Sequence, residues 1–250
     1  MSRMKFMNTE IDNITMDEAL DKIDELILEN KNAYVVTPNV DHIIKLENGG
    51  EFCDVYENAN LILTDGKPLI WISKLYKTPI KEKISGSDLF PKVCELAAKK
   101  GYRMYFLGAA EGVASNAAEI LMKKNPGLQV VGTYSPPIGF ENDENEMNKI
   151  INQIREVKPH ILILGLGSPK QELFILHNKD KLEVPISLGL GASLDFEAGR
   201  IKRAPAWMSN LGLEWLFRFF HEPKRLFKRY FIDDMKILKL AKKYRGNNGR

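Results

Sequence analysis

The sequence predicts an α/β fold, a Rossmann-like, doubly wound and mainly parallel sheet, followed by a helical C-terminal appendage. Short apolar, β-branched runs alternate with longer segments of helical periodicity through the first three quarters of the chain. Such alternation indicates parallel strands joined by right-handed crossovers, with helices on both faces of the sheet. The composition changes near Gly199, after which the chain is aromatic and basic. We therefore expect an α/β body over residues 1–199 and a helical appendage over residues 200–250.

Six runs predict the strands, and three longer segments predict the clearest helices. The first helix is expected over Thr15–Asn30, where apolar residues recur at helical spacing and Thr15 with Glu18 forms a capping box. Similar periodicity predicts helices over Ser85–Lys100 and Asn142–Lys158. The expected strands are Ala33–Thr37, Leu61–Thr64, Arg103–Leu107, Gln129–Tyr134, Ile161–Leu164 and Pro185–Leu188.

The composition narrows the class of protein. No stretch approaches the roughly 18 apolar residues of a membrane span, and the first residues lack the apolar region of a signal peptide. These observations predict a cytoplasmic protein. Cys53 and Cys94 stand alone in helix-like segments, which is typical of reduced core residues and not of a disulfide or a metal site.

Charge is distributed unevenly along the chain. The net charge is +3, but residues 200–250 hold 14 Lys or Arg against 4 Asp or Glu, a net of +10, so residues 1–199 carry −7. A basic segment on an acidic body indicates an anionic partner. Charge alone leaves nucleic acid, an anionic lipid surface and a phosphorylated ligand open.

The residues that follow each strand are the candidate site, because ligands of open α/β sheets bind beyond the carboxyl ends of the strands. After the first strand, Thr37 and Asn39 offer short polar groups, although Asn39 alone is more typical of a helix N-cap. After the second strand, the carboxylate of Asp65 can project into a cleft as a general base, or it can cap the next helix. Asp41 and Asp195 are the other candidates for a general base.

Glycine-rich turns follow the later strands. Gly108 begins a turn that can present backbone N–H groups to a phosphate, although such glycines often serve the turn alone. Gly165 and Gly167 leave the backbone bare before a helix whose first turn holds Gln171, and we expect the Gln171 amide to reach a ligand. The turn over Gly189–Asp195 is similar.

The sequence lacks the motifs of several other classes of enzyme. The full dinucleotide fingerprint and the P-loop spacing are not present, which disfavours an NAD-dependent oxidoreductase. The Asp-x-Asp pair that clamps a metal and a diphosphate in many sugar-nucleotide enzymes is also missing, and the four histidines form no metal motif. We therefore expect no cofactor and no divalent metal.

Taken in order, these turns resemble the WecG/TagA/CpsF glycosyltransferases (glycosyltransferase family 26). The resemblance covers nearly the whole chain, and Gly-x-Gly-x-Pro-x-Gln-Glu with the downstream Glu-Trp and Glu-Pro-x-Arg is its most specific part. The matching stretches are Thr37-Pro-Asn, Thr64-Asp-Gly, Ser85-Gly-Ser-Asp-Leu, Phe106-Leu-Gly, Gly165-Leu-Gly-Ser-Pro-Lys-Gln-Glu, Gly189-Leu-Gly-Ala, Arg203-Ala-Pro, Leu213-Glu-Trp, Arg218, Glu222-Pro-Lys-Arg-Leu and Lys228-Arg-Tyr.

The resemblance implies an inverting transferase that moves N-acetylmannosamine from UDP onto undecaprenyl-diphosphate-linked N-acetylglucosamine, a step toward wall teichoic acid. Other members use UDP-N-acetylmannosaminuronate or other hexoses, so the sequence leaves the identity of the donor sugar open. It also leaves open whether the protein forms a homo-oligomer. The resemblance also implies a peripheral protein at the inner face of the membrane, whose appendage closes over the active site. A nucleic-acid-binding protein is the alternative, disfavoured because the aromatic, leucine-rich segment 207–220 fits an anionic membrane surface better.

Motif by motif, the resemblance makes Asp65 the catalytic base and gives Asp195 a contact with the nucleotide. Lys83 stands where family members often carry Arg, and Lys lacks the planar fork that binds phosphate through two hydrogen bonds. Without a metal, arginines of the appendage are expected to neutralise the leaving diphosphate. The residues expected to bind the substrates are Thr37, Asn39, Lys83, Gly108, Gly165, Gly167, Gln171, Asp195, Arg218, Arg225 and Arg229.

Overall fold

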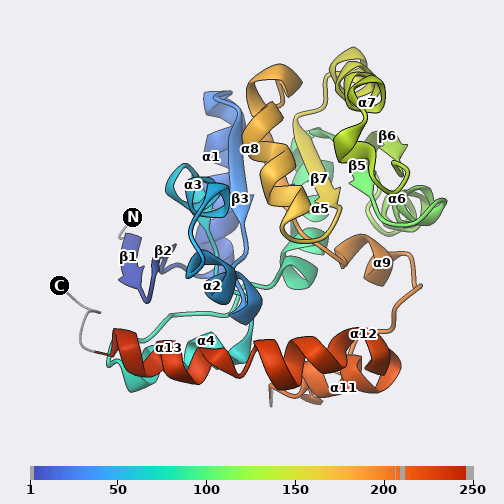
Figure 1. The fold of residues 1–250 in the computed structure, drawn as a ribbon. Helices are drawn as coiled ribbons and strands as arrows, with labels where there is room; N and C mark the ends of the chain where they lie inside the picture. Colours follow the sequence, from blue (N-terminus) through green and yellow to red (C-terminus); the bar gives the residue numbers. More distant parts are fainter. Residues whose placement is uncertain (1–2, 206, 209–211, 246–250) are drawn as a thin grey trace.

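A computed structural model describes residues 3–205, 207–208 and 212–245, and the side chains of Arg225 and Arg229 lie outside that description. Its centre is a six-stranded parallel sheet with the strand order β4-β3-β8-β7-β5-β6 (Figure 1). The strands are β3 (Ala33–Val36), β4 (Leu61–Ile62), β5 (Arg103–Gly108), β6 (Gln129–Tyr134), β7 (Ile161–Gly165) and β8 (Ile186–Gly189). Each one falls on a predicted run, which confirms the α/β fold.

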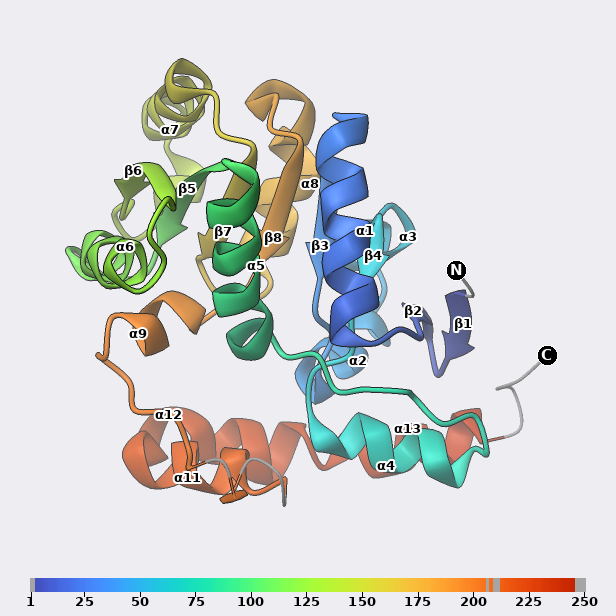
Figure 2. The same ribbon diagram turned by 180° about the vertical axis from the view of Figure 1, so that it is seen from behind.

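Helices cover both faces of the sheet, because the central strands are apolar on both sides. Along β7, Leu162 belongs to one core cluster, whereas its neighbours Ile161 and Ile163 belong to the other. The first face carries α2 (Val40–Leu46), α3 (Glu51–Glu57), α7 (Glu144–Val157) and α8 (Lys170–Leu182). The second face carries α1 (Met16–Glu29), α5 (Gly86–Lys100) and α6 (Val113–Lys124) (Figure 2).

Helix α1 confirms the capping box that the sequence predicts. The Thr15 hydroxyl accepts a hydrogen bond from the Glu18 backbone N–H at 3.3 Å, and the Glu18 carboxylate accepts one from the Thr15 N–H at 2.7 Å. These two bonds satisfy N–H groups that the first turn of a helix leaves without partners. The helix ends at Asn30, which adopts the left-handed conformation.

An N-terminal hairpin, which we did not predict, precedes the α/β body. Its strands are β1 (Arg3–Phe6) and β2 (Thr9–Asp12), paired antiparallel. The Asp12 carboxylate accepts a hydrogen bond from the Ile62 N–H at 2.8 Å and pairs with Arg3 at 3.2 Å. Asp12 therefore satisfies a backbone group of β4, the edge strand of the sheet, which would otherwise stay open to pairing.

The C-terminal helices lie below the carboxyl ends of the strands, beside α4 (Lys67–Leu75) (Figure 1). Beyond α9 (Ser193–Glu197), the helices are α11 (Glu214–His221), α12 (Pro223–Lys228), the π-helix η2 (Arg229–Asp233) and α13 (Lys236–Tyr244). Helix α13 is part of the main core, where Leu240 is buried and the Tyr76 hydroxyl donates to the Ala241 carbonyl at 2.7 Å. Helix α11 has no buried residue. Along the described part of the chain, no helix is long and apolar enough to cross a bilayer.

Candidate active site

A cavity lies between the carboxyl ends of four strands and the C-terminal helices. The chain winds outward from β3 to β4 and then crosses to β5, so the direction of winding changes beside β3. Such a switch point is where open α/β sheets bind their ligands. The loops after β3, β4, β7 and β8 enclose a volume of about 690 Å³ together with α11, η2 and α13. This volume is within the range of small-molecule sites.

The cavity brings together nine of the residues that the sequence predicts for the site. They come from separate segments of the chain, which meet because parallel strands end at one edge of the sheet. The nine are Thr37, Asn39, Asp65, Lys83, Gly165, Gly167, Gln171, Asp195 and Arg218. Asp41, the other candidate for a general base, also lines the cavity and pairs with Lys45 at 2.7 Å.

Backbone hydrogen bonds hold Asp65 at the floor of this cavity. Its N–H donates to the Pro38 carbonyl at 2.8 Å, and the Thr64 carbonyl accepts from the Ile84 N–H at 2.8 Å. The loop after β4 is thus fixed between the loop after β3 and the segment before α5. The N-cap of α4 is Gly66, with φ +98°, and not Asp65. Asp65 therefore lines the cavity instead of capping the helix, which resolves the two interpretations left open by the sequence.

The surroundings of Asp65 make its carboxyl group a proton acceptor near neutrality. Burial raises the pKa of Asp65 from 3.8 to about 7, and the negative charges of Glu214 and Asp88 act in the same direction. The positive charges of Lys83 and Arg218 oppose the rise. A general base works best when its pKa lies near the working pH. Such a shifted carboxyl in a cleft is typical of a catalytic group.

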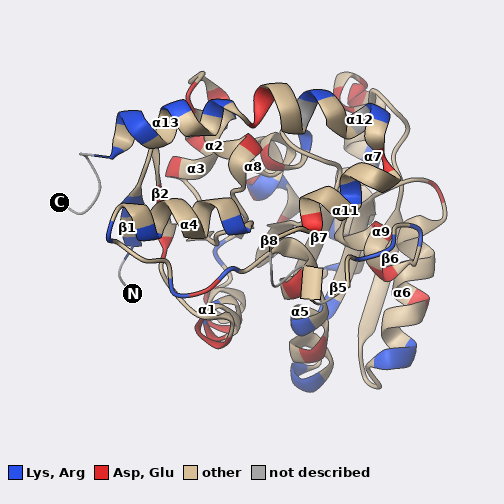
Figure 3. Cartoon of the chain, turned by 90° about the horizontal axis from the view of Figure 1, so that it is seen from below, with Lys and Arg blue, Asp and Glu red and all other residues tan. Residues whose placement is uncertain are grey.

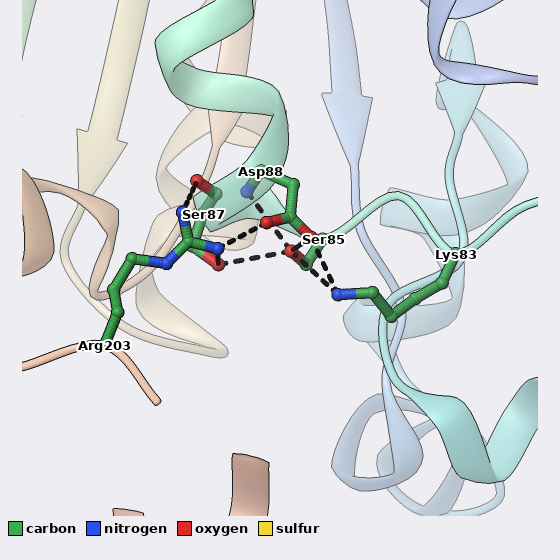
Figure 4. Close-up of polar contacts among 5 residues, drawn as sticks. All are labelled: Lys83, Ser85, Ser87, Asp88 and Arg203. Atoms are coloured by element: carbon green, nitrogen blue, oxygen red, sulfur yellow. Dashed lines mark hydrogen bonds and ion pairs between the residues drawn. The ribbon is translucent and has the colours of Figure 1, made fainter. Parts of the chain in front are cut away.

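Lys83 is held at the cavity by the start of α5 (Figure 4). Its ammonium group donates to the Asp88 carboxylate at 2.7 Å, and that carboxylate also accepts from the Ser85 hydroxyl at 2.6 Å. Burial opposes the charge on Lys83, but its pKa is nevertheless raised because Asp88 and Asp65 stabilise the cation. Lys83 is thus a fixed positive charge beside Asp65.

The side chains of Asn39 and Gln171 are engaged within the protein. The Asn39 side chain accepts from the His42 N–H at 3.3 Å and caps α2, which is the more ordinary of its two interpretations. Gln171 is buried, accepts from the Gly191 N–H at 3.1 Å and donates to Glu172 at 2.7 Å. The Gln171 amide thus joins the first turn of α8 to the loop after β8, and its contact with a ligand stays a prediction.

A buried polar cluster lies behind Gln171 and was not predicted. The Glu172 carboxyl is 3.9 Å from His42 Nε2, and His42 Nδ1 is 2.6 Å from the Tyr56 hydroxyl. Burial raises the pKa of Glu172 to about 7, although the hydrogen bond from Gln171 acts against the rise. This cluster connects α2, α3 and α8 beneath the cavity and fixes the Gln171 side chain.

Gly108 does not line the cavity but permits two strand ends to approach. It has φ +115°, and a Cβ atom there would lie 2.6 Å from the carbonyl carbon and oxygen of Gly165. A real Cβ cannot occupy that space, so the contact between β5 and β7 requires glycine. The N–H of the next residue, Ala109, donates to the Gly165 carbonyl at 2.9 Å, and the contact of this turn with a phosphate stays a prediction.

The C-terminal helices close the cavity with Arg218. Its Cζ atom lies 5.7 Å from the Phe196 ring, and its buried Nε has no hydrogen-bond partner among the described residues. Asp195, expected at the nucleotide, pairs with Arg200 at 3.1 Å. The predicted roles of Arg225 and Arg229 fall on side chains outside the described residues.

Comparisons with known proteins decide the family. Residues 4–250 match the model of the glycosyl transferase WecG/TagA/CpsF family. The chain belongs to this family of glycosyltransferases.

Curated relatives in this family share a quarter to a third of their residues with the chain. An N-acetylglucosaminyldiphosphoundecaprenol N-acetyl-beta-D-mannosaminyltransferase of Bacillus spizizenii (strain W23) is 32% identical over 79% of this chain and 74% of its own length. The protein of the same name from Bacillus subtilis (strain 168) is 29% identical over 85% and 81%. The one from Staphylococcus aureus (strain MW2) is 25% identical over 90% and 87%.

Several side chains of this glycosyltransferase that matter to the site lie in its family motifs but were not predicted individually. Glu214 and Trp215, in the Leu213-Glu-Trp stretch, line the cavity. Asp88 and Arg203, in two other matching stretches, form an ion pair at the start of α5. The matching stretches were thus the signal that could have identified these residues, because nothing in their local sequence indicates a contact across more than a hundred residues.

Proposed function

We propose that the protein transfers N-acetylmannosamine from UDP to undecaprenyl-diphosphate-linked N-acetylglucosamine, with inversion at the anomeric carbon. The observation that carries the proposal is Asp65, a carboxyl group with a pKa of about 7 in the cavity at the strand ends of a WecG/TagA/CpsF glycosyltransferase. The names of the relatives, which specify this reaction, support the choice of substrates.

Asp65 is the base in this proposal. An acceptor hydroxyl gives its proton to the Asp65 carboxylate while its oxygen forms a bond to the anomeric carbon of the donor. The bond from that carbon to the diphosphate oxygen breaks, and UDP leaves with the electron pair. Attack from the face opposite the leaving group inverts the configuration. A positioned base of this kind contributes about 10²–10⁴-fold to a rate.

The leaving diphosphate is neutralised by cationic side chains in this proposal, without a metal or another cofactor. Lys83 and Arg218 line the cavity, and the buried Nε of Arg218 is a hydrogen-bond donor without a partner among the described residues. Arg225 and Arg229 are proposed as further donors from their family motifs. Activity should survive EDTA. Loss with EDTA and recovery with Mg²⁺ or Mn²⁺ would reject this part of the proposal.

The lipid-linked acceptor is proposed to arrive from an anionic membrane surface, with the protein peripheral at the inner face. Support comes from the Lys and Arg positions along α12 and α13 (Figure 3). It also comes from exposed apolar side chains of α4 and of the C-terminal segment, which together with these cations we call the basal surface. Apolar area and positive charge together are what binding to anionic lipids requires. The apolar members of the basal surface are Trp71, Leu75, Trp207, Trp215, Phe220, Phe227, Phe231, Ile232, Met235 and Leu238.

The donor can be identified by mass spectrometry of the product. Purified protein is incubated with a short-chain lipid-diphosphate-N-acetylglucosamine and either UDP-N-acetylmannosamine, UDP-N-acetylmannosaminuronate or a UDP-hexose. We expect a disaccharide product with the first donor. A product with another donor alone would assign the protein to a different polysaccharide, because members of this family share the fold but differ in the sugar.

The role of Asp65 is tested by Asp65→Asn, which keeps the shape of the side chain but cannot accept a proton. Turnover should fall by about 10²–10⁴-fold while donor binding remains. Asp21→Asn, an exposed carboxylate of α1, is the matched control and should leave turnover unchanged. Near-normal turnover by Asp65→Asn would exclude Asp65 as the base.

A further inference from the structure

Asp88 joins two cations that come from different parts of the chain. One carboxylate oxygen accepts from Lys83 Nζ at 2.7 Å, and the other pairs with the Arg203 guanidinium (Figure 4). Neither family membership nor the proposed chemistry assigns a role to Asp88 or to Arg203.

The first contact determines where the charge of Lys83 lies. Lys83 is only 16% exposed, and its ammonium group also lies 3.4 Å from the Ser85 hydroxyl, so its side chain is held against the start of α5. Among the neighbouring charges, Lys83 has the largest effect on the pKa of Asp65. Asp88 thus fixes the cation that keeps the base partly ionised.

The second contact fixes the linker that leads into the C-terminal helices. Arg203 lies between α9 and α11, with exposed residues on both sides of it at Lys202 and Pro205. Besides pairing with Asp88, its guanidinium donates to the Ser87 carbonyl at 3.3 Å and approaches the Ser87 hydroxyl at 3.5 Å. Helix α11, the next helix after this linker, carries Arg218, which lines the cavity.

We propose that Asp88 is a positioning residue for the transfer reaction. One of its carboxylate oxygens holds Lys83 beside Asp65. The other binds Arg203 and so holds the linker that leads into the C-terminal helices. The inference rests on the proposed function, because it assigns the role relative to Asp65. Although burial disfavours the charge of Asp88, hydrogen bonds from Lys83 and Ser85 lower its pKa to about 2, so the carboxylate stays ionised and can hold both cations.

The test uses two measurements on the full-length protein without substrates. The first is the titration of the Asp65 carboxyl carbon by NMR. The second is hydrogen exchange of the amides in the linker and in α11. The variants are Asp88→Asn, Arg203→Ala and Arg203→Lys. Glu95→Gln, an exposed carboxylate of α5 that pairs with Lys92, is the matched control.

Asp88→Asn should change both measurements. The Asp65 titration should move to higher pH, because Lys83 is no longer held beside Asp65 and Lys83 has a larger effect on the pKa of Asp65 than Asp88 has. A move to lower pH, which loss of the Asp88 charge alone would cause, would overturn the proposal. Linker exchange should become roughly tenfold faster or more, because the anchor of Arg203 is gone. Arg203→Ala should accelerate hydrogen exchange in the linker as much as Asp88→Asn does, but it should leave the Asp65 titration unchanged. Arg203→Lys should exchange more slowly than Arg203→Ala. Glu95→Gln should change neither the exchange nor the titration.

A change in only one of the two measurements with Asp88→Asn, or a fall in melting temperature alone, would overturn the proposal. If Asp88→Asn does not fold, Lys83→Met replaces it for the first contact and should move the Asp65 titration to higher pH. An unmoved titration there would also overturn the proposal. Since neither measurement uses donor or acceptor, failure of the transfer assay with the wild-type protein would reject the proposed function and leave this coupling testable.

Discussion

At the scale of single residues, Asp65 makes the free energy of unfolding depend on pH. Its pKa is 3.8 when solvated and about 7 in the folded protein, so the folded state binds more protons than the unfolded state between these values. Stability contributed by this group therefore falls as the pH rises from about 4 to about 7. Burial thus brings the pKa of Asp65 close to neutrality, and the ionised carboxylate destabilises the folded protein above that pH.

Asp65→Asn should consequently be more stable than the wild-type protein at pH 8 by roughly 2–4 kcal/mol, since one pKa unit corresponds to ~1.4 kcal/mol. Below pH 4 the two proteins should unfold at nearly the same denaturant concentration. Urea unfolding at both pH values measures the difference. Equal stability at pH 8 would show that the carboxylate is well solvated and that its pKa is not raised.

Most of the residues that line the cavity could be predicted from the sequence, but their hydrogen bonds could not. Asp65 and Thr37 follow strands, and the rule for open sheets places them at one edge. The hydrogen bonds of the Gln171 amide to Glu172 and Gly191 could not be predicted, because Gly191 comes close only in the folded chain. Asp88 pairs with a residue 115 positions away, a separation over which local sequence carries no information.

At the scale of elements, the contact between the ends of β5 and β7 depends on Gly108. Substituting alanine there puts a Cβ 2.6 Å from the Gly165 backbone, which cannot move without disturbing β7. Gly108→Ala should destabilise the protein by about 3 kcal/mol or more.

The matched control is Gly112→Ala, since Gly112 also has a positive φ, +77°, but nothing lies within 4 Å of its Cβ position. It should cost about 1 kcal/mol from backbone strain alone. The difference in stability between the two variants, measured by thermal unfolding, gives the part that is due to the contact between Gly108 and Gly165. A similar loss of stability in both variants would mean that the positive φ alone requires glycine at position 108.

Strands and helices of the body could be predicted because each is encoded by its own periodicity. The β1–β2 hairpin was missed although charged and apolar residues alternate along β1, because each strand has only four residues, too few for the alternation to decide. The sequence also placed residues 200–250 together in one appendage by composition, yet α13 is buried in the main core through Ile237 and Leu240. Composition reports charge and aromatic content, whereas core membership depends on which surface a helix meets.

At the scale of the whole molecule, the cavity and the basal surface lie at the same end of the sheet. The carboxyl ends of the strands form the cavity, and α4 with the C-terminal helices lies directly below them (Figure 1). The body contributes α4 to the basal surface, so binding to a membrane would not depend on the appendage alone. Helix α1, by contrast, ends at the amino ends of the strands, where Leu28 is 71% exposed.

The double variant Leu75→Glu/Leu238→Glu tests whether the basal surface binds lipid, with one substitution on α4 and one on α13. Both side chains are more than half exposed, so the fold should tolerate glutamate at each position. Losing two apolar contacts and adding two negative charges should weaken sedimentation with anionic vesicles roughly tenfold or more. Leu28→Glu makes one such substitution at the opposite end of the sheet and should bind vesicles like the wild-type protein. An equal loss for each added glutamate in the two variants would point to net charge alone, and undiminished binding by the double variant would exclude the basal surface as the membrane contact. Retention of the wild-type protein on DNA but not on vesicles, at matched salt, would favour a nucleic acid as the anionic partner.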